Sequence, residues 1–311
     1  LCDGIIPEWD EQSYTYILKG GPGVGKNTLM KRIVSKARGT GRTVEEFCCA
    51  SDPDSLDAVR IDGIVILDGT APHTIDPTIP GACQEIVNLG HFKNQNEFSK
   101  ERGKLKSLFD ENKSHYSVAY SFLAAAKALK ESAIVGAKKS MDIPLVNEFI
   151  SDFSLKRQGY NPRKLFLNAI TPDGSVDFSP TVSDELRQMT FGGITGAIIL
   201  SEAAKIINGA KVQLFMDPII PSSPRGIILD DIGVFITADE NLNECDDFLL
   251  RPLPEYIQFC RDEIKRLTDK AICELHHCKD IHDEIESRYR PFVDYKLVDI
   301  ETDNLLSKLG L

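Results

Sequence analysis

The sequence predicts an α/β protein made of two three-layer α/β/α domains, each extended by long helices. Three observations support this prediction. An apolar strand, a glycine-rich loop and an amphipathic helix follow one another over residues 14–37. A second apolar strand, residues 64–67, ends in the acid Asp68. The same order of strand, glycine-rich turn, helix and strands recurs in the second half of the chain, which indicates an internal duplication.

The glycine-rich loop has the pattern of a phosphate-binding loop. Residues 20–26 fit G-x-x-x-x-G-K-[ST] up to the lysine, and Asn27 stands where the pattern requires serine or threonine. Residues 14–18 predict the strand before the loop and residues 28–37 the helix after it. Backbone N–H groups and a helix N-terminus would then surround one anion, because glycines leave out the Cβ atoms that would block its approach. Lys26 would place its charge on the β- and γ-phosphates. The alternative is a glycine-rich turn with a surface lysine.

The next part of the chain is predicted to supply the ligand-side turn and the metal-binding acid of such a site. Residues 43–48 predict a strand, and residues 49–56 a polar turn at the carboxyl end of the sheet, where ligands of open α/β sheets bind. An apolar strand that ends in Asp68 is the Walker B pattern, which carries a carboxylate to the Mg²⁺ of a nucleotide. Gly69 follows, where many ATPases have a water-polarising glutamate. His73 is the candidate replacement, and a plain loop histidine is the equal alternative.

Long helices are predicted after this first sheet. Residues 94–139 contain no proline and have apolar residues at helical spacing, which predicts one long helix or a helical hairpin. Residues 141–156 predict another helix, and residues 158–162 a linker. We therefore expect one domain at residues 1–158 and a second at residues 159–311.

The second domain repeats the order of the elements but lacks the charged site residues of the first. Residues 192–196 align with the glycine loop and residues 233–236 with the strand that precedes Asp68. In this alignment nothing corresponds to Lys26, and Asp68 falls opposite Ala238. We therefore expect the first repeat alone to bind nucleotide.

The alignment also separates structural residues from ligand-binding ones. Residues 52–53 (Asp-Pro) recur as residues 217–218, which indicates a structural turn. Asp54 and Ser55 do not recur, so they are the better candidates for ligand contacts. A strand predicted at residues 164–170 has no counterpart in the first repeat. This suggests an N-terminally clipped sequence.

Four segments of the chain resemble uncharacterised bacterial ATPases with tandem P-loop domains. The resemblance covers nearly the whole chain and implies ATP binding and a duplicated fold. It departs from that family at Asn27, where the family has serine, and in the second half, where the family usually has an intact loop. The segments that carry the resemblance are residues 17–23, 51–57, 67–73 and 169–174.

The expected ligands are ATP and Mg²⁺. Lys26, Asp68 and His73 are the candidate catalytic residues, and Asn27 and Asp68 the candidate metal ligands. The candidate nucleotide-binding residues are Gly20, Gly21, Gly23, Val24, Gly25, Lys26, Asn27, Thr28, Asp54 and Ser55.

Three functions compete for this site. The first is a slow Mg²⁺-dependent ATPase that uses the first repeat only. The second is a nucleotide-binding switch or pseudo-NTPase that does not hydrolyse, which Asn27 and Gly69 favour over a fast ATPase. The third is a small-molecule kinase, which would need an acceptor pocket and a mobile lid.

Composition limits the partners. A formal charge of -11 over 311 residues disfavours nucleic acid, and no apolar run approaches the ~20 residues of a membrane helix. Eight cysteines without the spacing of a disulfide scaffold favour a cytoplasmic protein. Residues 257–285 follow a seven-residue apolar pattern, so this helix is expected to pack against its counterpart in the first repeat, a protein partner or a second copy of the chain.

Overall fold

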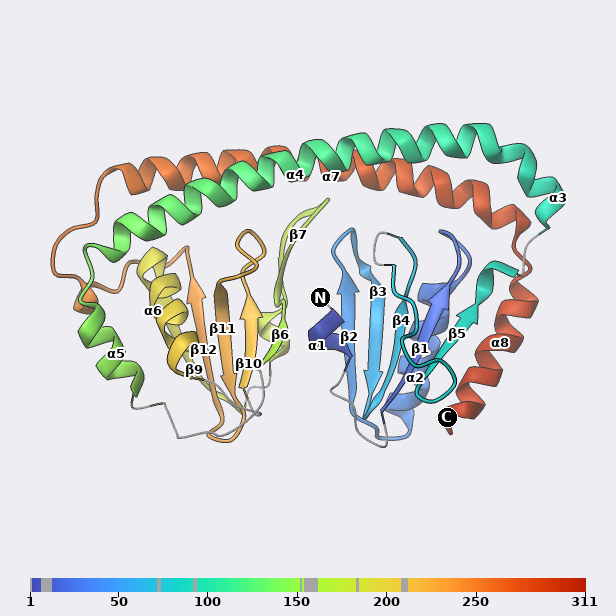
Figure 1. Cartoon of the computed structure of the whole chain (residues 1–311), viewed down its shortest axis with the longest axis horizontal. Helices are drawn as coiled ribbons and strands as arrows, with labels where there is room; N and C mark the ends of the chain where they lie inside the picture. The colour runs from blue at the N-terminus through green and yellow to red at the C-terminus, as the bar shows by residue number, and fades with distance from the viewer. Residues whose placement is uncertain are drawn as a thin grey trace. The chain divides into compact units, whose positions relative to one another are not determined.

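The structure is a computed structural model that describes residues 2–6, 13–71, 74–91, 94–151, 153, 162–182, 185–207 and 212–311. Contacts divide the chain into two compact units (Figure 1). The terminal unit contains residues 4–117 and 274–311, and the central unit contains residues 118–273. These units are not the consecutive segments 1–158 and 159–311. The boundaries differ because two long helices each contribute to both units.

The terminal unit is built on a five-stranded mixed sheet with the order β2-β3-β4-β1-β5. Strand β1 lies parallel to β4 and β5, whereas β2, β3 and β4 form an antiparallel meander. The meander arises because the turns between these strands are short and allow only antiparallel pairing. The strands are β1 (Tyr14–Lys19), β2 (Val44–Cys49), β3 (Asp52–Ile61), β4 (Ile64–Asp68) and β5 (Gln84–Asn88).

Strand β3 corrects the prediction of a polar turn at residues 49–56. Only residues 50 and 51 lie between the two strands, and Asp52 already pairs with Cys49. Three apolar side chains of β3 are buried against the sheet's two faces: Leu56, Ala58 and Ile61. The polar residues before them continue the same strand. The polar residues therefore belong to β3, and one of them, Ser55, contacts Asn27 directly after the loop.

Helices cover one face of this sheet. Helix α2 (Lys26–Gly39) and helix α8 (Tyr295–Lys308) pack with β1, β3 and β4 in one core. In the part of the chain that the structure describes, the opposite face is covered by the four-residue helix α1 (Cys2–Ile5) and a loop around Ile75. The expectation of two full helical layers around the sheet is therefore wrong for this unit.

The central unit has a second five-stranded mixed sheet, with the order β6-β10-β11-β12-β9. Helices α5 (Ile143–Ser151) and α6 (Gly193–Ile206) cover one face, and Phe215, Ile228 and Phe235 form a small core on the other. The strands are β6 (Arg163–Leu165), β9 (Arg187–Gly192), β10 (Val212–Met216), β11 (Pro224–Leu229) and β12 (Val234–Asp239).

The strand predicted at residues 164–170 is divided in two. Its first part is β6, and its second part is β7 (Asn168–Thr171), which pairs with β8 (Gly174–Asp177) in a separate hairpin. The predicted linker at 158–162 lies outside the described residues except for Pro162.

The two sheets share a four-stranded arrangement. The order β2-β3-β4-β1 matches β10-β11-β12-β9, and the strand directions match as well. The pairing register places Asp68 beside Leu18 and Ala238 beside Phe191. The fifth strand differs, because β5 adds next to β1 whereas β6 adds next to β10. A shared order is what a duplication predicts, and the duplication itself stays a prediction.

The predicted long helices are single and continuous. Helix α4 (Arg102–Lys138) and helix α7 (Tyr256–Tyr289) run alongside each other (Figure 1). In the terminal unit, Leu105 and Leu108 of α4 pack against Ile285 of α7. The seven-residue pattern of α7 therefore reflects packing on its counterpart, and association with another protein stays a prediction. Within the described residues, no helix combines the length and the apolar character needed to cross a membrane.

Candidate phosphate-binding site

The glycine loop connects β1 to α2 as the sequence predicts. Helix α2 begins at Lys26, two residues before the predicted start. Gly25 is its N-cap with φ 96°, and Gly23 has φ 69°; both values lie in the left-handed region that favours glycine. No side chain caps the helix. The first N–H groups of α2 are therefore not satisfied by a capping side chain, as a site for an external anion requires.

Lys26 lies inside the loop that precedes it. Its ammonium donates hydrogen bonds to the carbonyl oxygens of Gly20 at 2.5 Å and Gly21 at 3.3 Å. It also donates to Thr70 Oγ1 at 2.9 Å and lies 3.2 Å from Asp68 Oδ2. The side chain is 12% exposed. These contacts hold the charge at the mouth of the loop, where a phosphate would meet it.

Asp68 ends β4, the parallel neighbour of β1. Its Oδ1 accepts hydrogen bonds from the backbone N–H of Thr70, at 2.8 Å, and from the Thr70 hydroxyl. The structure therefore brings Lys26 and Asp68 together, and it adds Thr70. The position of Thr70, two residues after the acid, is the sequence signal for it. His73 lies outside the described residues.

Packing explains why no glutamate follows Asp68. A Cβ atom on Gly69 would lie 2.3 Å from Cγ2 of Ile17, a residue that is fully buried in β1. The Gly69 carbonyl also accepts a hydrogen bond from the Lys19 ammonium at 2.9 Å. A side chain at position 69, including a water-polarising acid, would therefore require the sheet to shift.

Asn27 contacts β3. Its Oδ1 accepts a hydrogen bond from the Leu56 N–H at 3.2 Å, and its Nδ2 donates to Ser55 Oγ at 3.0 Å. The Ser55 hydroxyl donates in turn to Asp52 Oδ2 at 2.6 Å. Among the hydrogen bonds of the described residues, none joins Asn27 to Asp68. The two candidate metal ligands, Asn27 and Asp68, therefore bond to different groups. Asn27 does contact Ser55, which is another candidate nucleotide-binding residue.

The remaining candidates differ in exposure. Val24 is buried at 1% exposed, and Thr28 and Asp54 are exposed. The Asp54 N–H donates to Asp52 Oδ1 at 3.3 Å, which is an Asx-type turn contact. Asp217 makes the equivalent contacts in the central unit, with the N–H groups of Ile219 and Ile220 at 2.8 Å. Asp217 thus accepts turn contacts just after β10, whereas Asp52 is the first residue of β3, and the interpretation of the two Asp-Pro pairs as structural turns stays a prediction.

A segment far from the loop in sequence covers it. A Cβ atom on Gly21 would lie 2.4 Å from Cε1 of Tyr289, and one on Gly25 would lie 3.2 Å from Cγ1 of Val298. The Tyr295 hydroxyl donates a hydrogen bond to the Gly23 carbonyl at 2.8 Å. The end of α7 and the start of α8 thus form one wall of the loop. No local motif marks these residues, so sequence reasoning missed them.

At the corresponding helix N-terminus of the central unit lies a carboxylate from the same chain. Strand β9 ends at Gly192 and α6 begins at Gly193, with no loop between them. The Glu244 carboxylate accepts hydrogen bonds from the Thr195 N–H at 2.9 Å and the Thr195 hydroxyl at 2.8 Å. It also pairs with Arg261. The helix N-terminus that would hold a phosphate is occupied by a carboxylate of the same chain.

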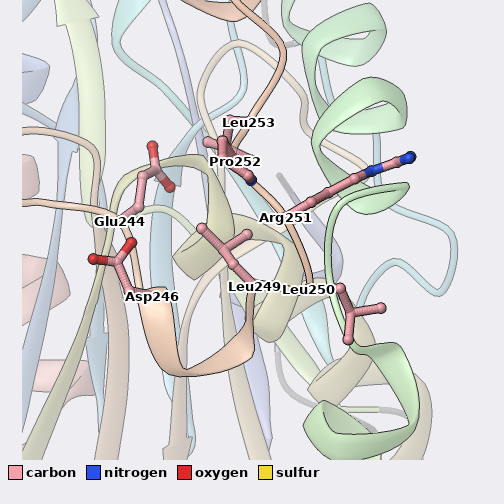
Figure 2. Close-up of a pocket in the computed structure, with 7 residues that line it drawn as sticks. All are labelled: Glu244, Asp246, Leu249, Leu250, Arg251, Pro252 and Leu253. Carbon is pink, nitrogen blue, oxygen red and sulfur yellow. The ribbon is translucent and has the colours of Figure 1, made fainter.

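A surface hollow of about 480 Å³ lies beside this position. Figure 2 shows the Glu244 and Asp246 carboxylates on one side of it and the Arg251 side chain directed away from them. None of its lining residues belongs to the glycine loop. The hollow is therefore separate from the candidate site. Its lining residues are Glu244, Asp246, Leu249, Leu250, Arg251, Pro252 and Leu253.

The Asp68 carboxylate beside Lys26 is a donor of the kind that a magnesium nucleotide uses. Mg²⁺ at such sites is held by one or two carboxylates together with phosphate oxygens and water, so Asp68 is a sufficient protein carboxylate. The described residues contain no cluster of three or more His, Cys, Asp or Glu side chains that could hold a metal by itself. Comparison with protein-family models, curated proteins and solved structures finds no match.

Proposed function

We propose that the terminal unit binds Mg²⁺-ATP at residues 20–28 and hydrolyses it slowly, and that the central unit binds no nucleotide. One observation carries the proposal. The Lys26 ammonium is held by the Gly20 and Gly21 carbonyls next to the Asp68 carboxylate, at the end of two parallel neighbouring strands. A cation, a carboxylate and the start of a helix at one sheet edge are the parts that phosphoryl chemistry uses.

Different groups of the site would bind the phosphates and the metal. The N–H groups of the loop and of the first turn of α2 would bind phosphate oxygens, and Lys26 would add a charge-assisted contact. Asp68 would hold Mg²⁺, with Asn27 as the second candidate ligand. The metal would neutralise charge that develops on the phosphates.

Two observations support slow turnover. The Asn27 amide already contacts Leu56 and Ser55, so it is not free to join Asp68 without giving up those contacts. An acid at position 69 that would polarise water would require the sheet to shift. The same two observations favour the second candidate function, a nucleotide-binding switch that does not hydrolyse.

Calorimetric titration of the whole chain with Mg²⁺-ATP tests the proposal. We expect one site per chain, and loss of binding in Lys26→Ala, because a charge-assisted hydrogen bond contributes about 1.5–3 kcal/mol. Lys36→Ala is the matched control, since Lys36 is an exposed lysine in the last turn of the same helix. Two equivalent sites would contradict the assignment to the terminal unit, and no binding by the wild type would contradict nucleotide binding altogether. Phosphate release then separates slow hydrolysis from a switch.

A further inference from the structure

The wall of the glycine loop makes a directed polar contact with the loop. The hydroxyl of Tyr295, the first residue of α8, donates a hydrogen bond to the Gly23 carbonyl at 2.8 Å. Burial raises the pKa of the Tyr295 hydroxyl above its ordinary value, with Arg290 opposing this shift and Glu286 adding to it. The hydroxyl is therefore protonated, and able to donate, throughout the physiological range.

This contact determines the direction of the next N–H group. The Gly23 carbonyl and the Val24 N–H belong to the same peptide unit, and in a planar trans peptide they point in opposite directions. A carbonyl that points to Tyr295 turns the Val24 N–H away from α8. Rotation of this peptide unit would exchange the donor for an acceptor, and a carbonyl oxygen repels a phosphate.

The Val24 N–H itself needs an acceptor. Val24 is 1% exposed. Within the part of the chain that the structure describes, no hydrogen bond is formed by its N–H. Buried backbone N–H groups are paired in more than nine cases out of ten, with protein groups or with ordered water, so the Val24 N–H can accept a partner from outside the protein. An anion in the loop supplies such an acceptor.

We propose that Tyr295 is a positioning residue of the phosphate loop, whose hydroxyl holds the Gly23 carbonyl so that the Val24 N–H points at phosphate. The inference rests on the proposed function of the loop. It adds that the nucleotide site is completed by the C-terminal helix of the same chain. Lys26 binds the ligand directly, whereas Tyr295 acts through one peptide unit.

Tyr295→Phe tests the assignment because it removes only the hydroxyl and keeps the ring that packs near Gly25. Tyr256→Phe is the matched control. The two tyrosines are similarly exposed, at 42% and 43%, and Tyr256 lies in the central unit. The measurements are the affinity for Mg²⁺-ATP, the unfolding temperature without nucleotide, and hydrogen exchange of the peptide spanning residues 20–28 without nucleotide.

We expect Tyr295→Phe to bind Mg²⁺-ATP about 3- to 10-fold more weakly, the range that one hydrogen bond contributes. Its loop amides should exchange faster than those of the wild type, at an unchanged unfolding temperature. Tyr256→Phe should match the wild type in affinity and in exchange of the loop.

The outcomes separate this inference from the proposed function. If the wild type binds Mg²⁺-ATP and Tyr295→Phe binds it equally well, the positioning assignment is wrong and the proposed function stands. If the wild type does not bind Mg²⁺-ATP, the proposed function fails. Hydrogen exchange then decides about Tyr295, since unchanged exchange in the variant would show that the hydroxyl does not hold the loop.

Discussion

The Lys26 ammonium lies 3.2 Å from Asp68 Oδ2, so the cation of the glycine loop and the acid that ends β4 meet at one edge of the sheet. Parallel pairing of β1 with β4 brings them together, because the carboxyl ends of parallel neighbours lie side by side. The same geometry is absent from the central unit, where the register places Ala238 at the corresponding position of β12.

Asn27→Ser restores the residue that the phosphate-loop pattern requires. A hydroxyl fits the tight shell of Mg²⁺ better than the longer, branched amide, which is already bonded to Ser55 and Leu56. We expect kcat for ATP hydrolysis to rise by about 10-fold, which corresponds to ~1.4 kcal/mol of barrier, with little change in ATP affinity. The measurement is steady-state phosphate release across a Mg²⁺ series.

The control for this variant is Asn304→Ser, which makes the same change on an exposed position of α8. It should leave kcat unchanged. An equal or lower kcat in Asn27→Ser would show either that the amide is a competent ligand or that the protein does not hydrolyse ATP.

Gly69→Ala tests the close approach of the backbone behind the site. The added Cβ would lie 2.3 Å from the buried Ile17, so the sheet must shift to accept it. We expect the free energy of unfolding to fall by about 1–3 kcal/mol, the usual cost of overpacking a core. Denaturant unfolding measures this value. Gly39→Ala is the matched control, because a Cβ there meets no atom within 4 Å; comparable losses in both variants would refute the packing argument.

Glu244→Ala empties the anion position of the central unit. The variant leaves the Thr195 N–H and the Arg261 guanidinium without their carboxylate, so we expect a lower unfolding temperature. Inorganic phosphate should raise this temperature more in the variant than in the wild type, because it can occupy the helix N-terminus. Thermal unfolding at matched ionic strength, with chloride in place of phosphate, measures the difference. Equal phosphate effects on both proteins would show that Glu244 does not stand in for an anion.

The buried pair of Lys130 and Asp217 predicts a loss of stability in acid. Burial acts to raise the pKa of Asp217, but Lys130 at 2.6 Å and two backbone N–H groups outweigh it, and the pKa is lowered. A carboxyl whose folded pKa lies below its unfolded value stabilises the fold above the unfolded pKa. This stabilisation is lost as pH falls through the folded pKa.

Asp217→Asn measures this contribution. The wild type should have the higher free energy of unfolding at pH 6, and the difference between the two proteins should shrink as pH falls below about 4, near the ordinary pKa of an aspartate. Asp173→Asn, at an exposed turn position, is the control and should show no such trend. A difference that does not change with pH would mean that Asp217 acts through its hydrogen bonds alone.

The local elements of the site could be predicted from the sequence. The spacing of glycines and apolar residues is enough to predict a strand, a loop and a helix over residues 14–39, because each forms from contacts between near neighbours in the chain. Strand β4 with its terminal Asp68, the long helices and the repeated order of elements follow from the same kind of pattern.

Only the tertiary structure decided what surrounds those elements. Strand β3 was missed because its polar residues 52–55 resemble a turn until Leu56 and Ala58 are seen to pack inward. The contact of Tyr295 with Gly23 and the contact of Glu244 with Thr195 join segments that are distant in sequence. Such contacts depend on how α7, α8 and α6 pack, which no local spacing records. The sequence by itself therefore determined the cation and the acid of the candidate site, and the packing of distant helices determined which groups complete it.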